Sequence, residues 1–175
     1  MKHINWLRWN SCLLFVVVMI AICGCKDSST ENRIKRITSR KITLPETVST
    51  QQLQDKPYRA VLWISDKECT RCRINTLPAY IEFYESTRDV LDFFVVISSP
   101  DVSIYSQAIA DQCLPFPVYF DAFDKFRRLN RHVPLESKYH FFLLDSSGLP
   151  MVVGDPVFNS GISQIYVSVF GGDEG

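Results

Sequence analysis

Hydrophobic and polar positions follow two different rhythms along this chain. Continuous apolar runs at residues 60–65 and 91–98 are typical of strands that are buried on both faces of a sheet. A shorter apolar run at 118–120 predicts a third strand. Residues 141–145 and 150–154 flank a Ser-Ser-Gly turn, which predicts two strands paired as a hairpin.

Other segments repeat their apolar residues with helical spacing. The segment after Cys72 predicts a helix kinked at Pro78, whose buried face would hold Ile74, Leu77, Tyr80, Ile81 and Tyr84. Shorter helices are expected within 101–112 and around 123–130, with inward residues Ile104, Ala108 and Ile109 in the first and Phe126 and Leu129 in the second. Residues 162–170 predict a closing helix, although their Val and Ile content also suits a strand. The alternating order predicts an α/β sandwich with a mixed sheet.

The N-terminus has the three parts of a secretory signal. It begins with the basic residues Lys2 and Arg8, continues with an apolar run at 13–23, and reaches the small residue Gly24 directly before Cys25. A transmembrane helix is the alternative, but the apolar run is shorter than the roughly 20 residues that span a bilayer. We therefore predict a signal peptide that is cleaved before Cys25.

The tetrapeptide Ile22-Cys23-Gly24-Cys25 resembles the lipobox of bacterial lipoproteins. The resemblance implies that Cys25 carries a diacylglycerol, whose two acyl chains anchor a protein stably. The mature protein would then lie in the cell envelope, on the periplasmic or surface face of a membrane outside the cytoplasm. Such a compartment permits disulfides.

Removal of residues 1–24 leaves about 150 residues, the usual size of one domain. We expect 25–56 to be the lipidated N-terminus and a polar tether, with 42–45 as a candidate short strand, and 57–175 to form the domain. The basic patch of the tether is interpreted as solvated, with contact to anionic lipid as the alternative. The mature chain keeps 17 basic and 19 acidic residues, so nucleic acid is not an expected partner.

Six cysteines are present, but only three remain after signal cleavage and lipidation. Cys69 and Cys72 form a C-x-x-C between a predicted buried strand and a predicted helix. There the first thiol meets the unpaired N–H groups and positive dipole end of the helix, which stabilise a thiolate. The second thiol, one turn later, faces the first and can close a disulfide. Cys113 is expected to be a buried or partly buried free thiol, with a third redox thiol as the alternative.

Three other roles of the C-x-x-C compete with redox chemistry. Zinc would need a second pair of ligands, and the mature chain offers only His132 and His140, without a second C-x-x-C. Haem attachment would need a histidine directly after the second cysteine, where this chain has Arg73. A purely structural disulfide stays open as the third role. We therefore expect no cofactor and no metal.

The stretch 60–78, with its strand, C-x-x-C, helix and helix proline, resembles the active-site unit of thioredoxin-like thiol-disulfide oxidoreductases, notably the membrane-anchored bacterial type. Phe-Leu-Leu-Asp-Ser-Ser-Gly at 142–148 is similar to the F-L-I-D-x-x-G of that group, and the likeness spans most of 58–170. The resemblance implies a three-layer thioredoxin-like sandwich with a central mixed sheet. It also implies that Cys69 attacks and Cys72 resolves, acting on extracytoplasmic protein thiols or disulfides with an unknown electron donor.

The chain departs from this family at three positions. Glu68 stands where Trp usually precedes the first cysteine, and Pro78 lies nine residues after Cys69 instead of eight. Tyr139 occupies the place of the family's cis-proline, and Pro117 precedes a different strand. These losses are expected to weaken peptide binding. They leave two hypotheses: a redox pair for a specialised partner, or a non-catalytic binding or structural module with a structural disulfide.

Residues near the cysteine pair are candidate modulators of Cys69. They are Lys67, Glu68, Arg71, Arg73, Tyr139 and His140. Positive charge favours a thiolate, whereas Asp66 and Glu68 oppose it. His140 qualifies because the adjacent position in the family lies near the cysteines. A peroxidase resembling peroxiredoxin is disfavoured, because no P-x-x-x-T-x-x-C pattern precedes Cys69.

Overall fold

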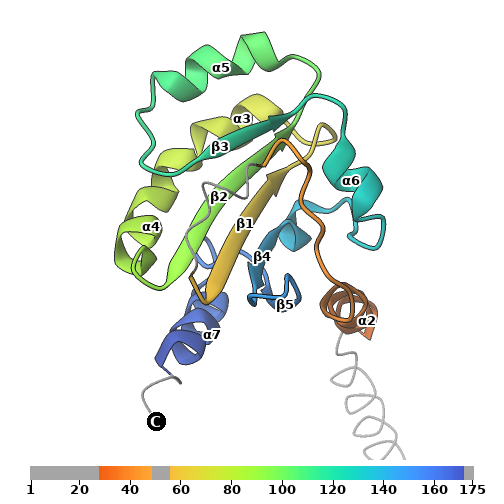
Figure 1. Cartoon of the computed structure of the whole chain (residues 1–175). Coiled ribbons are helices and arrows are strands. Elements are labelled where there is room, and N and C mark those ends of the chain that lie inside the picture. The colour runs from red at the N-terminus through yellow and green to blue at the C-terminus, as the bar shows by residue number, and fades with distance from the viewer. Residues whose placement is uncertain (1–27, 49–55, 172–175) are drawn as a thin grey trace, which may run out of the picture. The chain divides into compact units, whose positions relative to one another are not determined.

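The structure is a computed structural model that describes residues 28–48 and 56–171. The predicted signal peptide, the predicted lipidation site Cys25 and the stretch 49–55 lie outside the described residues. The described residues from Ile34 onward form one compact unit, and Figure 1 shows its elements. Within the described part, no helix is long and apolar enough to cross a membrane.

A five-stranded mixed sheet, in the order β3-β2-β1-β4-β5, forms the centre of this unit (Figure 1). Its strands are β1 Tyr58–Ile64, β2 Leu91–Ser98, β3 Val118–Asp121, β4 Phe141–Leu144 and β5 Pro150–Val153. The first three run parallel, while β4 pairs antiparallel with both β1 and β5. Gly148 turns the β4–β5 hairpin with a φ of +86°, which glycine adopts without strain. The strands predicted from the apolar runs after residue 57 are thus confirmed.

The helices follow the predicted alternating order. They are α2 Ser28–Thr38, α3 Thr70–Asn75, η2 Leu77–Tyr80, α4 Ile81–Thr87, α5 Val102–Ala110, α6 Lys125–Leu129, η3 Ser137–Tyr139 and α7 Ser160–Gly171. The run α3, η2 and α4 joins β1 to β2, and α5 joins β2 to β3. Pro78 lies in the first turn of η2, so the α-helical run breaks there as predicted. The last element is a helix and not a strand.

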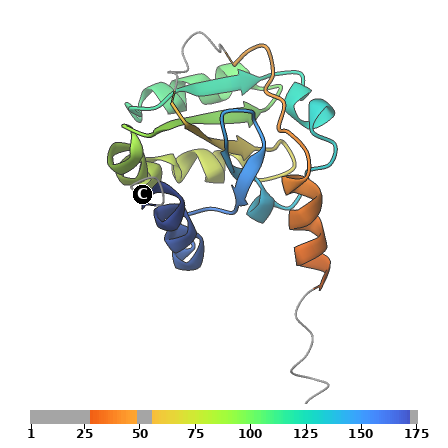
Figure 2. The same cartoon turned by 60° about the horizontal axis from the view of Figure 1, so that its bottom comes forward.

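Both faces of the sheet are buried, as its continuous apolar runs predict. Along β1, Leu62 and Ile64 pack in one core and Val61 and Trp63 in the other, because successive side chains of a strand point to opposite faces. Residues of α3, η2 and α7 complete the first core, and Phe126 of α6 belongs to the second. Figures 1 and 2 both show α6 well apart from α4 and α7.

Two of the predicted inward faces are wrong in part. No residue of α5 is buried, and Ile104 is 57% exposed, whereas Tyr105 and Ile109 pack against the first core. In α6, Phe126 is buried as predicted, but Leu129 is 49% exposed. Both helices are short and cover only part of the sheet, so one or two side chains suffice to seal the core beneath them.

The segment 34–48, which the sequence analysis assigns to the tether, packs against the domain. Ile37, Ile42 and Val48 are buried in the second core. Asn130 holds the backbone of Thr43 on both sides: the Thr43 N–H donates to its Oδ1 and its Nδ2 donates to the Thr43 carbonyl, both at 2.8 Å. The stretch 42–45, the candidate short strand, forms no strand. The packed body therefore begins well before residue 57.

Candidate functional site

Cys69 and Cys72 are joined in a disulfide at the start of α3. Their Cα atoms lie 5.2 Å apart, and both residues are exposed. Cys69 is the N-cap of the helix, and its Sγ accepts a hydrogen bond from the Cys72 N–H at 3.3 Å. The strand β1 ends at Ile64, and a short loop carries the chain from there to Cys69. The pair therefore lies just beyond the end of β1, at the solvent-accessible start of α3.

This position suits thiol chemistry. A sulfur at a helix N-cap faces backbone N–H groups that have no partner inside the helix. Such donors stabilise a thiolate more than a neutral thiol, which lowers the pKa of a cysteine placed there. When the disulfide opens, Cys69 is the sulfur that already accepts a backbone hydrogen bond. The geometry therefore places Cys69, and not Cys72, at the N-cap of the helix.

Glu68, the residue before Cys69, is held by His140. The imidazole is fully buried at 0% exposure, and its Nδ1 lies 2.7 Å from Oε1 of Glu68. On the other side, Nε2 lies 2.9 Å from the carbonyl oxygen of Pro134. The ring also packs on Trp63 of β1, with ring centroids 4.2 Å apart. The loop before the cysteines is thereby tied to the segment that precedes β4.

Both ring nitrogens of His140 face oxygen atoms that accept hydrogen bonds. The Pro134 carbonyl can only accept, so Nε2 must carry a hydrogen. The contact between Nδ1 and Glu68 then needs a second hydrogen, which resides on the imidazole or on the carboxyl group. In either form the pair carries these two hydrogens and has no net charge. Such a pair is cheaper to bury beside the disulfide than a lone carboxylate.

Arg73 extends this network along the first turns of the helix. Its Nε lies 3.5 Å from Oε2 of Glu68. Further along, the Tyr80 hydroxyl donates a hydrogen bond to Asp155. Burial, then the Asp155 carboxylate, raises the pKa of Tyr80, while Arg73 acts in the opposite direction. Tyr80 is therefore a neutral donor at physiological pH, fastening the helix to the loop after β5.

The other three predicted modulators are Lys67, Arg71 and Tyr139. Lys67 is exposed and pairs with its neighbour Asp66 at 3.1 Å, and Arg71 is exposed. Tyr139 is buried, with the ammonium group of Lys138 5.0 Å from its ring centroid. The described chain contains no cis peptide bond, so the place of the family's cis-proline has a trans backbone. Of the six modulators, the structure brings Glu68, Arg73 and His140 together.

Cys113 differs from its prediction. It is a free cysteine and is exposed, where the sequence analysis expects burial. It follows the end of α5 with a positive φ of 49°, and this turn holds its side chain at the surface. Among residues 28–48 and 56–171, no group of three or more His, Cys, Asp or Glu side chains is arranged to hold a metal ion.

Sequence reasoning missed the structural supports of the site. Trp63 donates from Nε1 to Ser98 Oγ at 3.0 Å, and Ser98 Oγ donates to Asp121 at 3.2 Å. The Asp121 carboxylate also accepts two backbone N–H groups of α6. This chain crosses three strands and ends at a helix, so no local sequence signal reveals it. The Pro134 carbonyl is a backbone group and leaves no trace in residue types.

Comparison with known proteins identifies the fold. No family model matches the sequence, and no curated protein matches it. Among solved structures, a candidate thiol-disulfide oxidoreductase from Bacteroides vulgatus matches with a TM-score of 0.54 at 15% identity, covering 69% of this chain and 78% of that one. A thiol:disulfide interchange protein from Bacteroides sp. matches with a TM-score of 0.52, also at 15% identity and with the same coverage. A thioredoxin-like protein in the oxidized form matches at 0.50, with 14% identity over 71% and 85% of the two chains.

These likenesses establish that the chain has an α/β thioredoxin-like fold, with its five-stranded mixed sheet flanked by helices. The predicted fold class is therefore confirmed. On that fold the chain carries a cysteine pair with C-x-x-C spacing, joined as a disulfide. At such low identity the comparison establishes the fold and leaves the activity to be argued from the site.

Proposed function

We propose that this protein is a thiol-disulfide oxidoreductase in which Cys69 and Cys72 alternate between dithiol and disulfide on a protein partner. The observation that carries the proposal is the exposed disulfide at the N-cap of α3, on a thioredoxin-like fold. Exposed disulfides are typically the labile or catalytic ones, whereas structural disulfides resist reduction. We assign the attacking role to Cys69 and the resolving role to Cys72.

The reaction balances without a cofactor. The Cys69 thiolate attacks one sulfur of a partner disulfide, forms a mixed disulfide and releases the other partner sulfur as a thiolate. The Cys72 thiolate then attacks the Cys69 sulfur and releases the second partner thiolate. The partner gains two electrons and two protons, and this protein becomes the disulfide. A dithiol protein outside the cytoplasm would restore the reduced form, and the reverse direction uses the same steps.

We also propose that the protein acts outside the cytoplasm and is held on a membrane by lipid on Cys25. The lipobox-like tetrapeptide 22–25 supports the anchor. Mass spectrometry of the mature N-terminus tests it: we expect a peptide that begins at Cys25 and carries diacylglycerol. A Cys25→Ser variant should keep its signal segment and carry no diacylglycerol, and an unlipidated wild-type protein would contradict the anchor.

Insulin reduction in the presence of dithiothreitol tests the redox proposal, using the mature chain without its lipid. Cys69→Ser should lose activity, and Cys72→Ser should stall as a mixed disulfide that can be trapped with a partner. Cys113→Ser is the matched control, because Cys113 is exposed and unpaired and should not alter the rate. Equal activity of the parent and both pair variants would eliminate the oxidoreductase proposal.

A non-catalytic thioredoxin-like module is the second candidate. Glu68 replaces the family's Trp, and Tyr139 with a trans backbone replaces its cis-proline, which supports this alternative. The two candidates differ in reduction potential: a value below about −300 mV with an unreactive Cys69 indicates a structural disulfide. Lys67, Arg71 and Tyr139 remain proposed modulators, together with the network of Glu68, Arg73 and His140.

A further inference from the structure

A pocket of about 310 Å³ lies between α6 and the segment that leads to His140. Its lining includes three arginines and one carboxylate together with an apolar wall: Arg127, Arg128, Arg131, Asp124, Pro134 and Leu135. We call it the arginine pocket. Leu135 is 42% exposed, so the pocket offers an accessible apolar contact beside its guanidinium groups.

The arginine pocket is connected through His140 to the loop that carries the cysteines. The Pro134 carbonyl in its wall accepts from His140, and the same imidazole bonds to Glu68, the residue before Cys69. A second link is electrostatic: burial and then the Asp66 carboxylate, which belongs to the loop before Cys69, raise the pKa of Asp124. The pocket wall and the residue before Cys69 are therefore held by one and the same imidazole.

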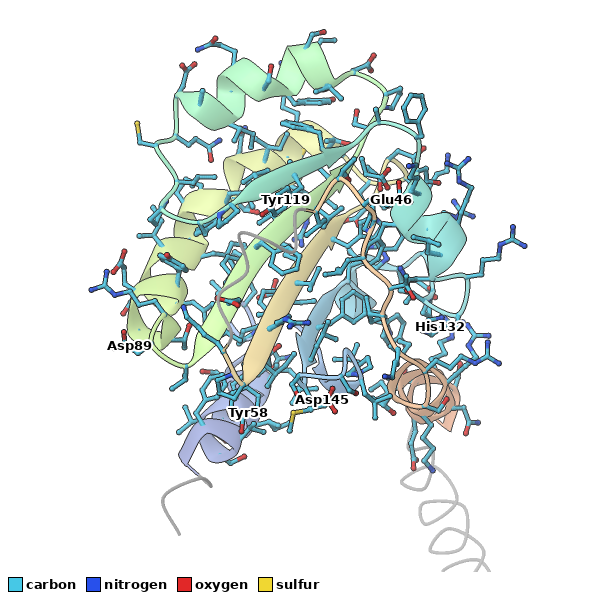
Figure 3. The ribbon with its side chains drawn as sticks, in the orientation of Figure 1. Glu46, Tyr58, Asp89, Tyr119, His132 and Asp145 are labelled. Atoms are coloured by element: carbon cyan, nitrogen blue, oxygen red, sulfur yellow. A yellow bond between two sulfur atoms is a disulfide. The ribbon has the colours of Figure 1, made fainter. Side chains whose placement is uncertain are left out.

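Positive charge is concentrated on this side of the protein. Three guanidinium groups face one carboxylate in the pocket, although the whole chain has 19 basic and 19 acidic residues. Burial is the larger cause that lowers the pKa of His132, and the positive charges of Arg40 and Arg36 lower it further. Figure 3 shows His132 on this flank with nitrogen-tipped side chains around it, while Asp89 lies on the opposite flank. The partner that fits is negatively charged.

We propose that the arginine pocket binds an acidic segment of the protein partner, whose carboxylates flank the disulfide that Cys69 attacks. The inference rests on the proposed oxidoreductase function and specifies its substrate class. Glu68 and Tyr139 remove the family's apolar docking surface beside the nucleophile, and the pocket supplies a charged surface in its place. A lipid headgroup offers phosphate to the same arginines, but the apolar wall of the pocket suits the side chains of a reducible chain.

Charge complementarity at this site acts on the rate of encounter and on the choice of partner. Each exposed ion pair is worth a factor of roughly 2 to 5 in rate. All three arginines together should favour an acidic over a neutral substrate by about 10- to 100-fold at low salt. The preference should shrink as salt is added, because exposed charges are screened.

The test uses the reduced mature chain carrying Cys25→Ser and Cys113→Ser, so that no other thiol reacts. The substrates are short peptides with one cysteine in mixed disulfide with thionitrobenzoate, flanked by Glu, Gln or Lys. Attack by Cys69 on the peptide sulfur releases the coloured thionitrobenzoate, and Cys72 then releases the peptide thiol. We expect the Glu peptide to react fastest and the Lys peptide slowest in stopped-flow measurements.

The triple variant Arg127→Gln, Arg128→Gln and Arg131→Gln should lose most of the preference for the Glu peptide. The exposed Arg88, which pairs with Glu85 on α4, provides the matched control: Arg88→Gln should keep it. If the triple variant fails to fold, as judged by circular dichroism, Arg128→Gln and Arg131→Gln are measured singly. Each should lower the preference about 2- to 5-fold.

Neutral 2,2′-dipyridyl disulfide separates this inference from the function on which it rests. It has no acidic group for the arginine pocket to bind, so its rate reports the thiol reactivity of the cysteine pair without the pocket. A parent protein inert to this reagent overturns the oxidoreductase proposal and the inference with it. A reactive parent with equal rates for all three peptides overturns the pocket inference alone. Loss of binding to phosphatidylglycerol vesicles in the triple variant, with its peptide preference intact, assigns the arginines to the membrane and also overturns it.

Discussion

Replacing His140 by leucine should destabilise the protein strongly, because the imidazole serves two acceptors at once. Leucine keeps most of the volume but donates no hydrogen bond. The variant loses the contact to Glu68 at 2.7 Å and strands the Pro134 carbonyl, which His140 meets at 2.9 Å. His140 and Pro134 are both buried, so water has little access to the Pro134 carbonyl. Both losses act in the folded state.

The magnitude follows from these two contacts. A hydrogen bond to a charged group contributes about 1.5–3 kcal/mol, and a stranded buried acceptor costs about 1–3 kcal/mol. The Glu68 side chain keeps 14% exposure and its contact with Arg73, which offsets part of the first loss. We therefore expect His140→Leu to lower the free energy of unfolding by about 3–4 kcal/mol. Glu68→Gln keeps a neutral hydrogen bond and should cost about 1 kcal/mol.

Urea denaturation of the oxidised mature chain without its lipid measures both effects, and a double-mutant cycle gives the coupling between them. His132→Leu is the matched control, since His132 is also buried but its Nε2 meets no hydrogen-bond partner within the described part of the chain. This control should change the free energy of unfolding little at pH 7.5. A His140→Leu protein within about 0.5 kcal/mol of the parent, or a coupling near zero, would refute the reasoning.

Three further effects follow from single side chains. Burial, then Arg40 and Arg36, lowers the pKa of His132 below its usual 6.5, so the unfolded state binds the proton more readily and stability falls as the pH drops below about 6.5. The His132→Gln variant should therefore show urea midpoints that depend less on pH between pH 7 and 5. A pH dependence equal to that of the parent would contradict this. Asp121 is 1% exposed and accepts two N–H groups at the start of α6 at 2.9 and 2.8 Å. Asp121→Ala should lower the free energy of unfolding by about 2–4 kcal/mol, and Asp121→Asn should lower it less. Thermal unfolding measures both, and melting temperatures equal to that of the parent would disprove the capping role. Asn130→Ala removes two hydrogen bonds of 2.8 Å to the segment after α2 and should speed proteolysis within residues 34–48. An unchanged cleavage rate would show that other contacts hold this segment.

The local elements of this fold were predictable from sequence because they depend on short-range patterns. The apolar runs of β1 and β2 are continuous since both faces of these strands are buried. The break at Pro78 and the turn at Gly148 follow from the backbone limits of proline and glycine. The proximity of Cys69 and Cys72 was equally accessible, because a spacing of three residues on the first turn of a helix places two thiols together.

The exposure of single side chains was less predictable. Spacing indicates which residues share a helix face, but how much of that face meets the core depends on what lies beneath it. Ile104 and Leu129 lie in helices that each cover only part of the sheet, and they remain exposed. Ile37 and Ile42 belong to a segment whose polar composition indicated a tether, yet they are buried, because the second core offers them an apolar surface.

By itself, the sequence determined the order of elements and the C-x-x-C spacing of Cys69 and Cys72, and it predicts an anchor at Cys25. Only the tertiary structure decided what surrounds the reactive pair. His140 and Glu68 are more than seventy residues apart in sequence, and the sheet alone brings them within 2.7 Å. The arginine pocket likewise depends on where α6 packs. Contacts between distant segments are decided by the packing of the whole core, which no local pattern of residues encodes.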